Sequence, residues 1–92
     1  MKWIEIIELR SAGNTRKQLE THLQEFIEQV EKKTEKQTVK LYTRMMIDTD
    51  FSIHLFHESS KVKNRGSPLG LRLVSALKSY GMVYHTIWIE KQ

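Results

Sequence analysis

The spacing of apolar residues alternates between strand-like and helix-like along this chain, and that succession restricts the folds open to it more than any other feature. Isoleucine-rich or alternating segments, which predict strands, lie at residues 3–9, 39–47, 51–58 and 82–89. Helical spacing falls between the first and second of these segments, and again between the third and fourth. The 92 residues therefore predict one domain spanning residues 1–92, with the element order β-α-β-β-α-β.

The segment after Gly13 has the pattern of an amphipathic helix. Thr15 fits an N-cap, and Gln18 three residues later completes a capping box. One apolar stripe at helical spacing follows, formed by Leu19, Leu23, Phe26, Ile27 and Val30. We expect this helix to end in the polar stretch 32–38.

A second helix is predicted to begin at Ser67-Pro68, where a capping side chain precedes a proline at the first helical position. Its inner stripe is formed by Leu73, Val74 and Leu77. Gly81 fits the C-terminal stop of this helix, because glycine accepts the left-handed conformation that often ends a helix.

The segments 39–47 and 51–58 predict a β-hairpin, because the Asp48-Thr49-Asp50 sequence between them has turn chemistry. Folding the chain about Thr49 pairs Ile47 with Phe51, Met45 with Ile53, and Thr43 with Leu55 on an apolar face. The opposite face then pairs Met46 with Ser52, Arg44 with His54, Tyr42 with Phe56, and Lys40 with Glu58. Aromatic and opposite-charge partners meet in this register, which is therefore the one we predict.

This element order is typical of a ferredoxin-like sandwich, an α+β fold in which two helices cover one face of a four-stranded antiparallel sheet. The other sheet face would carry mixed residues, namely Tyr42, Arg44, Met46, His54, Phe56, Tyr84 and Trp88. Sheet faces that meet solvent are usually polar, and this one is rich in aromatic rings. We expect a contiguous apolar surface of this kind to be covered by another molecule. The simplest cover is a second copy of the chain, so we expect a homodimer formed through the open sheet face.

The C-terminal third has a distinctive run, which reads Ser67-Pro68-Leu69-Gly70-Leu71-Arg72-Leu73, continues to Leu77, and ends in Gly81-Met82-Val83-Tyr84-His85-Thr86-Ile87-Trp88. Together with the element order and the mixed sheet face, this run resembles the dimeric α/β-barrel proteins, in particular the small members similar to antibiotic-biosynthesis monooxygenases. The resemblance implies two chains packed sheet to sheet and a cavity between sheet and helices for a hydrophobic small molecule. It carries over no catalytic residue, since Asn14 and Asn64 both fall in predicted loops.

The mixed face supplies the first candidate site. A small-molecule site there would use Tyr42, Arg44, His54, Phe56, Tyr84 and Trp88. Arginine and histidine beside aromatic rings could orient an aromatic or carboxylated molecule, with His54 exchanging a proton near neutral pH. The alternative is that these residues are anchors in a dimer interface, where arginine, tyrosine and tryptophan are common. A cofactor-free monooxygenase-like activity is a further alternative.

A second candidate site lies around the predicted start of the second helix. It is a possible anion site formed by Lys61, Lys63, Arg65 and Arg72. Backbone N–H groups and the helix dipole attract anions at such a position. The alternative is a solvated loop, because the glycine spacing matches no phosphate-binding motif.

Several other functions find little support. His54 and His57 are three apart on a strand and so point to opposite faces, and we predict no metal site and no cofactor. Aromatic residues on a four-stranded sheet also suit single-stranded RNA binding, but the strand 51–58 has no glycine, arginine or lysine. Nucleic acid is therefore an improbable partner in this interpretation.

The composition indicates the character of the surface, the absence of cysteine chemistry and the expected location of the protein. The 15 basic and 11 acidic residues alternate along the chain, which indicates a solvated surface. Cysteine is absent, so disulfides and thiol catalysis are excluded. Glu5 and Glu8 interrupt the apolar N-terminal segment, so we expect no secretory signal, no membrane span and a cytoplasmic location.

Overall fold

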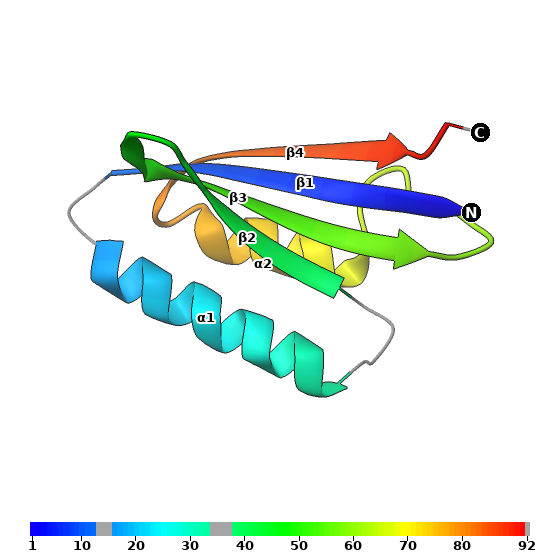
Figure 1. Cartoon of the computed structure of the whole chain (residues 1–92), viewed down its shortest axis with the longest axis horizontal. Helices are drawn as coiled ribbons and strands as arrows, with labels where there is room; N and C mark the ends of the chain where they lie inside the picture. Colours follow the sequence, from blue (N-terminus) through cyan, green and yellow to red (C-terminus); the bar gives the residue numbers. More distant parts are fainter. Residues whose placement is uncertain (13–15, 34–37, 92) are drawn as a thin grey trace.

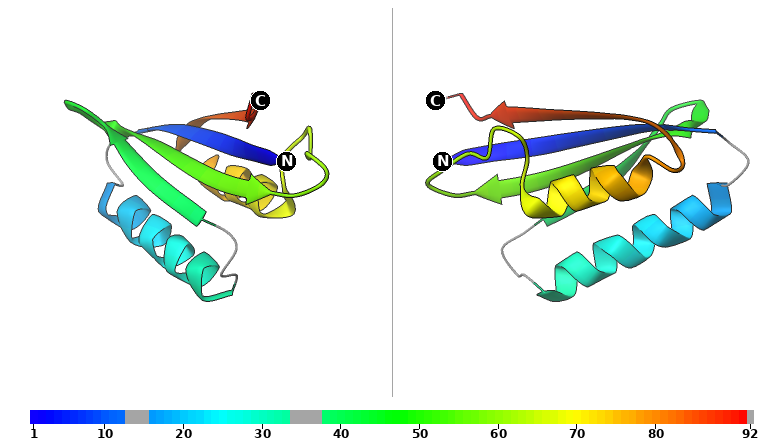
Figure 2. Two further views of the ribbon diagram at one scale, coloured as in Figure 1. Left: turned by 45° about the vertical axis from the view of Figure 1, so that its right-hand side comes forward. Right: turned by 180° about the vertical axis from the view of Figure 1, so that it is seen from behind.

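The computed structural model describes residues 1–12, 16–33 and 38–91. The chain forms β1 (Lys2–Ser11), α1 (Arg16–Lys33), β2 (Thr38–Arg44), β3 (Ile47–Glu58), α2 (Pro68–Leu77) and β4 (Gly81–Ile89). The four strands form one sheet in the order β2-β3-β1-β4, and every neighbouring pair is antiparallel. Both helices lie on the same face of this sheet (Figures 1 and 2). The predicted ferredoxin-like α+β fold is confirmed.

The hydrophobic core lies between the helices and the two central strands, β1 and β3. Ile7 of β1 and Ile53 of β3 pair across these strands, and neither is exposed to solvent. Alternate residues of a strand point to one face, so the neighbours on this face are also buried. The helices close the core with Leu19, Leu23 and Val30 of α1 and with Leu73 and Leu77 of α2. These are members of the two predicted apolar stripes.

The β2–β3 hairpin departs from the predicted register. Its turn is Met45-Met46, where Met46 adopts a positive φ of 67°, and not Asp48-Thr49-Asp50. Ile53 therefore pairs with Leu41 in place of Met45, a shift of four positions. Because this shift is even, residues 38–43 keep the faces that the sequence predicts for them, whereas the pairing becomes irregular at Arg44, which lies opposite Ile47.

Polar partners explain why the Asp48-Thr49-Asp50 segment stays in β3. The Thr49 carbonyl accepts a hydrogen bond of 2.8 Å from the Ser11 hydroxyl. Asp50 forms ion pairs with Arg10 at 3.8 Å and with Arg44 at 3.2 Å. Ser11 and Arg10 come from β1, a strand that sequence spacing alone does not place beside β3, and Arg44 is the last residue of β2.

The helix boundaries are confirmed at the start of α2 and corrected at its end. Ser67 is the N-cap, its hydroxyl accepts the Gly70 N–H, and Pro68 follows in the first turn. The helix ends at Leu77, and Gly81 begins β4 instead of ending α2. A side chain at Gly81 would overlap the backbone carbonyl of Arg10, so close strand packing requires glycine there. The predicted cap at Thr15 lies outside the described residues.

Candidate functional site

The sheet face away from the helices, here called the open face, carries the predicted aromatic residues. Phe56 and Trp88 lie on either side of Ile4, on the strands that flank β1. The most exposed of the predicted rings are Tyr42, Tyr84 and Trp88, at 46%, 48% and 57%. Five of the six predicted ligand-binding residues thus share this face as strand residues, and the sixth, Arg44, stands at its rim.

His54 lies in the middle of this open face among aromatic neighbours. Its ring centroid is 4.6 Å from that of Tyr42 and 6.3 Å from that of Phe56. Its Nε2 atom shares a 3.0 Å hydrogen bond with the Ser52 hydroxyl. Burial lowers the pKa of His54, and the nearby Glu8 carboxylate only partly opposes this effect. The imidazole is therefore biased toward its neutral form.

The expected Arg44–His54 and Tyr42–Phe56 pairs are wrong because of the hairpin register. His54 faces Lys40, and Phe56 faces Thr38. The Arg44 guanidinium instead forms an ion pair with Asp50, near the turn of the hairpin. Met46, predicted on this face, is a turn residue that is 94% exposed.

Two hollows lie at opposite ends of the open face. One, of about 490 Å³, is lined by residues that include Ile4, Phe56 and Trp88, with Lys2, Glu58 and Glu90 among its charged neighbours. The other, of about 280 Å³, is lined by residues that include Tyr42, Tyr84, Glu8 and Arg44. Aromatic rings of β4 line both hollows, Trp88 the first and Tyr84 the second. Each hollow therefore combines an open volume with a ring on which a ligand could stack.

The four predicted anion-binding residues, Lys61, Lys63, Arg65 and Arg72, are all exposed near the start of α2. Their role stays a prediction. The helix terminus itself already holds an anion, because the Ser67 N–H donates a 2.9 Å hydrogen bond to Glu5 Oε1. The helix dipole therefore acts on the protein's own carboxylate.

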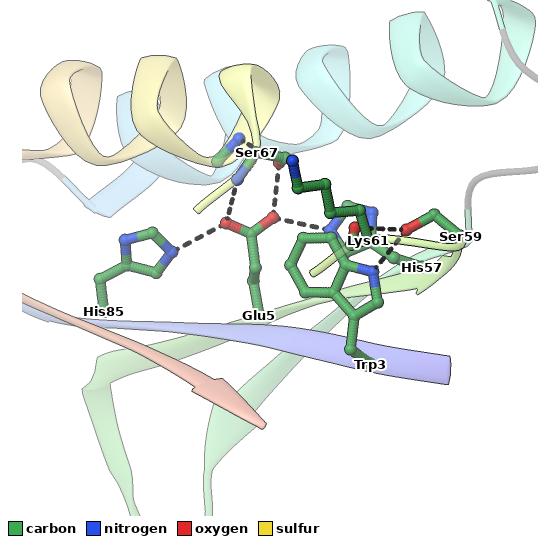
Figure 3. A network of polar contacts seen from close by, with 8 residues as sticks. Trp3, Glu5, His57, Ser59, Lys61, Ser67 and His85 are labelled. Atoms are coloured by element: carbon green, nitrogen blue, oxygen red, sulfur yellow. Dashed lines mark hydrogen bonds and ion pairs between the residues drawn. The ribbon is translucent and has the colours of Figure 1, made fainter. Parts of the chain in front are cut away.

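Glu5 is the centre of a polar cluster that the sequence did not predict. It points from β1 toward the start of α2, and His57 and His85 lie on either side of it (Figure 3). Oε2 is bound by the Ser67 hydroxyl at 2.5 Å and by His57 Nε2 at 2.6 Å. Oε1 is bound by the Ser67 N–H and, at 2.9 Å, by His85 Nε2. A carboxylate with no exposed surface thus receives four hydrogen bonds.

These contacts decide the charge of Glu5. Burial alone would raise its pKa, because it removes water from the carboxylate. The Ser67 hydroxyl and N–H, together with His57 and His85, outweigh that effect, so the pKa is lowered. Glu5 is therefore an ionised carboxylate in the interior, which is tolerated when its hydrogen-bonding capacity is filled.

Two glycines make room for this carboxylate. A side chain at Gly70, in the first turn of α2, would overlap Glu5 Oε1. A side chain at Gly66 would overlap the His85 ring, and Gly66 also has a φ of +106°, which favours glycine. The connection before α2 is therefore shaped around Glu5 and His85.

The His57 side of the cluster is fixed by stacking. The Trp3 ring lies on the His57 imidazole with a centroid separation of 4.0 Å and an interplanar angle of 22°. Trp3 Nε1 donates to the Ser59 hydroxyl, which in turn donates to the Lys61 carbonyl (Figure 3). The stacked rings and these two hydrogen bonds thereby join β1 and β3 to the connection that precedes α2.

A signal for this cluster was present in the sequence. Glu5 has the same parity as Trp3, Ile7 and Leu9, the side of β1 that is buried. His57 and His85 lie on the strands that flank β1, each two residues from the direct partners of Glu5, Leu55 and Ile87. One acidic residue among apolar ones, with histidines on both neighbouring strands, is the pattern that would have revealed it.

Within the described residues, no group of three or more His, Asp or Glu side chains could hold a metal ion. Neither helix, over the parts described, is long and apolar enough to cross a membrane. Comparison with family models, curated proteins and solved structures finds no match. The resemblance to the dimeric α/β barrels therefore stays a prediction.

Proposed function

We propose that this protein is a homodimer that pairs through its open face and holds a small hydrophobic or aromatic molecule there. The observation that carries the proposal is the exposure of Tyr42, Tyr84 and Trp88 on a single sheet face. Half-buried Ile4, Ile6 and Phe56 lie between these rings and extend the apolar surface. A contiguous surface of this kind on a folded domain marks an interaction site.

The area of the isolated chain supports a partner that covers this face. The chain exposes 6894 Å². The size scaling for folded monomers gives about 5,600 Å² for a mass of 10.9 kDa. The difference exceeds the roughly 800 Å² that each partner hides in an interface of standard size. A second copy of the same face supplies a cover of matching size and chemistry.

The hollow beside Trp88 supports the proposal of a ligand site on this face. Its volume of about 490 Å³ falls in the range of small-molecule sites. Trp88 and Phe56 offer ring faces for stacking, which favours an aromatic ligand over an aliphatic one of equal size. The partner's sheet would close this hollow from above and exclude water from it.

Single-stranded RNA is a less suitable occupant of the same face. Base stacking on aromatic residues is sequence-tolerant, but the phosphate backbone needs a basic surface. The open face carries four carboxylates, those of Glu8, Asp50, Glu58 and Glu90, beside its basic residues. This charge balance disfavours RNA.

Charge substitution on the open face tests the dimer. We expect wild-type protein to have twice the chain mass by light scattering, and Trp88→Glu to be a monomer, because a desolvated carboxylate is costly in an interface. Leu71→Glu is the matched control, since Leu71 is 48% exposed on α2, on the other side of the sheet. A wild-type monomer, or a dimer that Trp88→Glu leaves intact, would contradict the proposal.

Ligand binding is tested separately with a fluorescent aromatic probe, 1-anilinonaphthalene-8-sulfonate. We expect saturable binding to the wild-type dimer that Phe56→Ser weakens and Leu71→Ser does not. Binding that responds equally to both substitutions would contradict the ligand site while leaving the dimer standing.

A further inference from the structure

The two edges of the sheet differ in how they are protected from pairing with another strand. β2 forms one edge and β4 the other (Figure 1). β2 has seven residues, includes Lys40 and Arg44, and pairs irregularly with β3 at its end. Short length, charged residues and irregular pairing are features that keep edge strands from pairing further. β4 has nine residues with no charge and no proline, and it pairs regularly with β1 along its whole length. β4 therefore lacks these protections.

Hydrogen bonds at the two ends of β4 show which of its backbone groups face outward. The Glu90 N–H donates to the Lys2 carbonyl at 2.9 Å, and the Ala12 N–H donates to the Tyr80 carbonyl at 3.0 Å. Bonded and non-bonded residue pairs alternate along an antiparallel ladder, so the even-numbered residues of β4 bond to β1. The odd-numbered residues turn their N–H and C=O groups to the free edge, where no described part of the chain bonds to them. They are Gly81, Val83, His85, Ile87 and Ile89.

The surface of the chain leaves room for a contact at this edge. None of the nine residues of β4 is fully buried, although the odd-numbered ones face the helices. The whole chain exposes about 1,300 Å² more than the size scaling for monomers gives. An interface of standard size hides about 800 Å² of each partner, so about 500 Å² remains for a second, smaller contact.

A second copy of β4 fits this edge. Two identical strands pair antiparallel when a two-fold axis passes between them. An axis at His85 pairs all nine residues of each strand through their outward groups, and an axis at any other residue pairs fewer. Val83 then lies opposite the partner's Ile87, and Met82 opposite the partner's Trp88, so apolar side chains meet on both faces of the sheet. Since neither strand carries a charge, no like charges are opposed.

We propose that two chains pair along β4, antiparallel about a two-fold axis at His85, so that the sheet of one chain continues into the sheet of the other. The outward N–H and C=O groups of each strand satisfy those of its partner. This contact uses the edge of the sheet and does not depend on the proposed open-face dimer. With both contacts, four chains form a closed assembly. Because the edge contact is the smaller one, we expect it to form at higher protein concentration than the open-face dimer.

Backbone amide hydrogen exchange tests this contact, because it reports on single N–H groups. The full chain labelled with ¹⁵N is followed by NMR over a range of protein concentrations. We expect the amides of Tyr84 and Thr86, which bond to β1, to be protected at every concentration. The amides of Val83, His85 and Ile87 should exchange about three-fold more slowly for each ten-fold rise in concentration once paired chains predominate, because the unpaired fraction then falls as the square root of concentration.

Two variants separate the edge from the open face. Val83→Pro removes an outward N–H, and an edge strand tolerates proline where the N–H faces solvent. It should abolish the concentration dependence at His85 and Ile87 while the Thr86 amide stays protected. Tyr42→Glu places a charge on the open face at the opposite edge of the sheet. It should keep the concentration dependence of the odd-numbered amides, shifted to higher concentration.

Three results would overturn the proposal. Rapid exchange of the odd-numbered amides at every concentration of the pure chain would show that a second copy does not pair there, and would leave the edge to a segment of another protein. Protection that survives in Val83→Pro, or that disappears in Tyr42→Glu, would show that its source is not the β4 edge. If Val83→Pro does not fold, exchange in the wild-type chain and in Tyr42→Glu decides the question.

Discussion

The two faces of this sheet break the usual arrangement of polar and apolar residues in opposite ways. Toward the helices, a carboxylate and two imidazoles lie inside, and all four hydrogen bonds that reach Glu5 come from the protein. On the open face, tyrosine and tryptophan rings lie outside, and no described part of the chain covers them. Departures from the binary pattern tend to mark functional positions. The comparison teaches that the polar groups of the inner face find their partners within one chain, whereas the rings of the open face would find theirs in the proposed dimer.

The largest expected effect comes from emptying the inner cluster. Glu5→Ala leaves the donors of Ser67, His57 and His85 without their acceptor, and we expect a loss of about 3–5 kcal/mol in the free energy of unfolding. Glu8→Ala, on the exposed parity of the same strand, should change it by less than about 0.5 kcal/mol. Urea denaturation compares the two. Similar losses would mean that the inner face is no more complete than the outer one.

A smaller effect is expected from filling the space around the carboxylate. Alanine normally stabilises a helix relative to glycine by about 1 kcal/mol. At Gly70, however, the added carbon would overlap Glu5 Oε1, so we expect Gly70→Ala to destabilise the protein by about 1–3 kcal/mol. Ser75→Ala, an exposed position on the same helix, should stabilise it slightly. A stabilising Gly70→Ala would contradict the tight fit of the cluster.

The smallest effect is the pH dependence of stability, which separates the two faces. The lowered pKa of Glu5 gives stability that is present above its ordinary value of 4.5 and is lost as the pH falls through the lower folded value. The lowered pKa of His54 acts at higher pH, because the unfolded chain takes up a proton below 6.5 before the folded chain does.

Unfolding midpoints measured across acidic pH at one protein concentration separate these contributions. His54→Asn should remove the decline that begins near the ordinary histidine pKa of 6.5. Glu5→Gln should remove the decline that begins near 4.5. If His54→Asn left the first decline unchanged, the burial of His54 among the open-face rings would not be the cause.

Local patterns were sufficient to predict most of the fold. The alternation of strand residues and the stripe on each helix fix which side of every element is buried, and those assignments hold for Ile53, Leu55, Leu19 and Leu73. The Ser67 cap was equally local, since it depends on a hydroxyl and a proline in adjacent positions. The face assignment of residues 38–43 survived the register error, because parity is unchanged by an even shift.

The hairpin turn was predicted wrongly and the Glu5 cluster was not predicted, because both depend on residues from other strands. Turn chemistry at Asp48-Thr49-Asp50 was overridden by Ser11 and Arg10, which lie far away in the sequence, together with Arg44 of the same hairpin. The Glu5 cluster requires three strands and the start of α2 to meet at one carboxylate. Spacing within one segment cannot show such a meeting, although the parity of Glu5, His57 and His85 was already visible.

Quenching of Trp88 fluorescence tests the central claim most directly, because it reports on the open face itself. Trp88 is 57% exposed in the single chain, and a Trp3→Phe background leaves it as the sole tryptophan. We predict strong quenching by acrylamide in dilute protein and marked protection as the concentration rises and chains pair. Quenching that stays strong and independent of protein concentration, at concentrations where a dimer is present, would show that the partner does not cover this face.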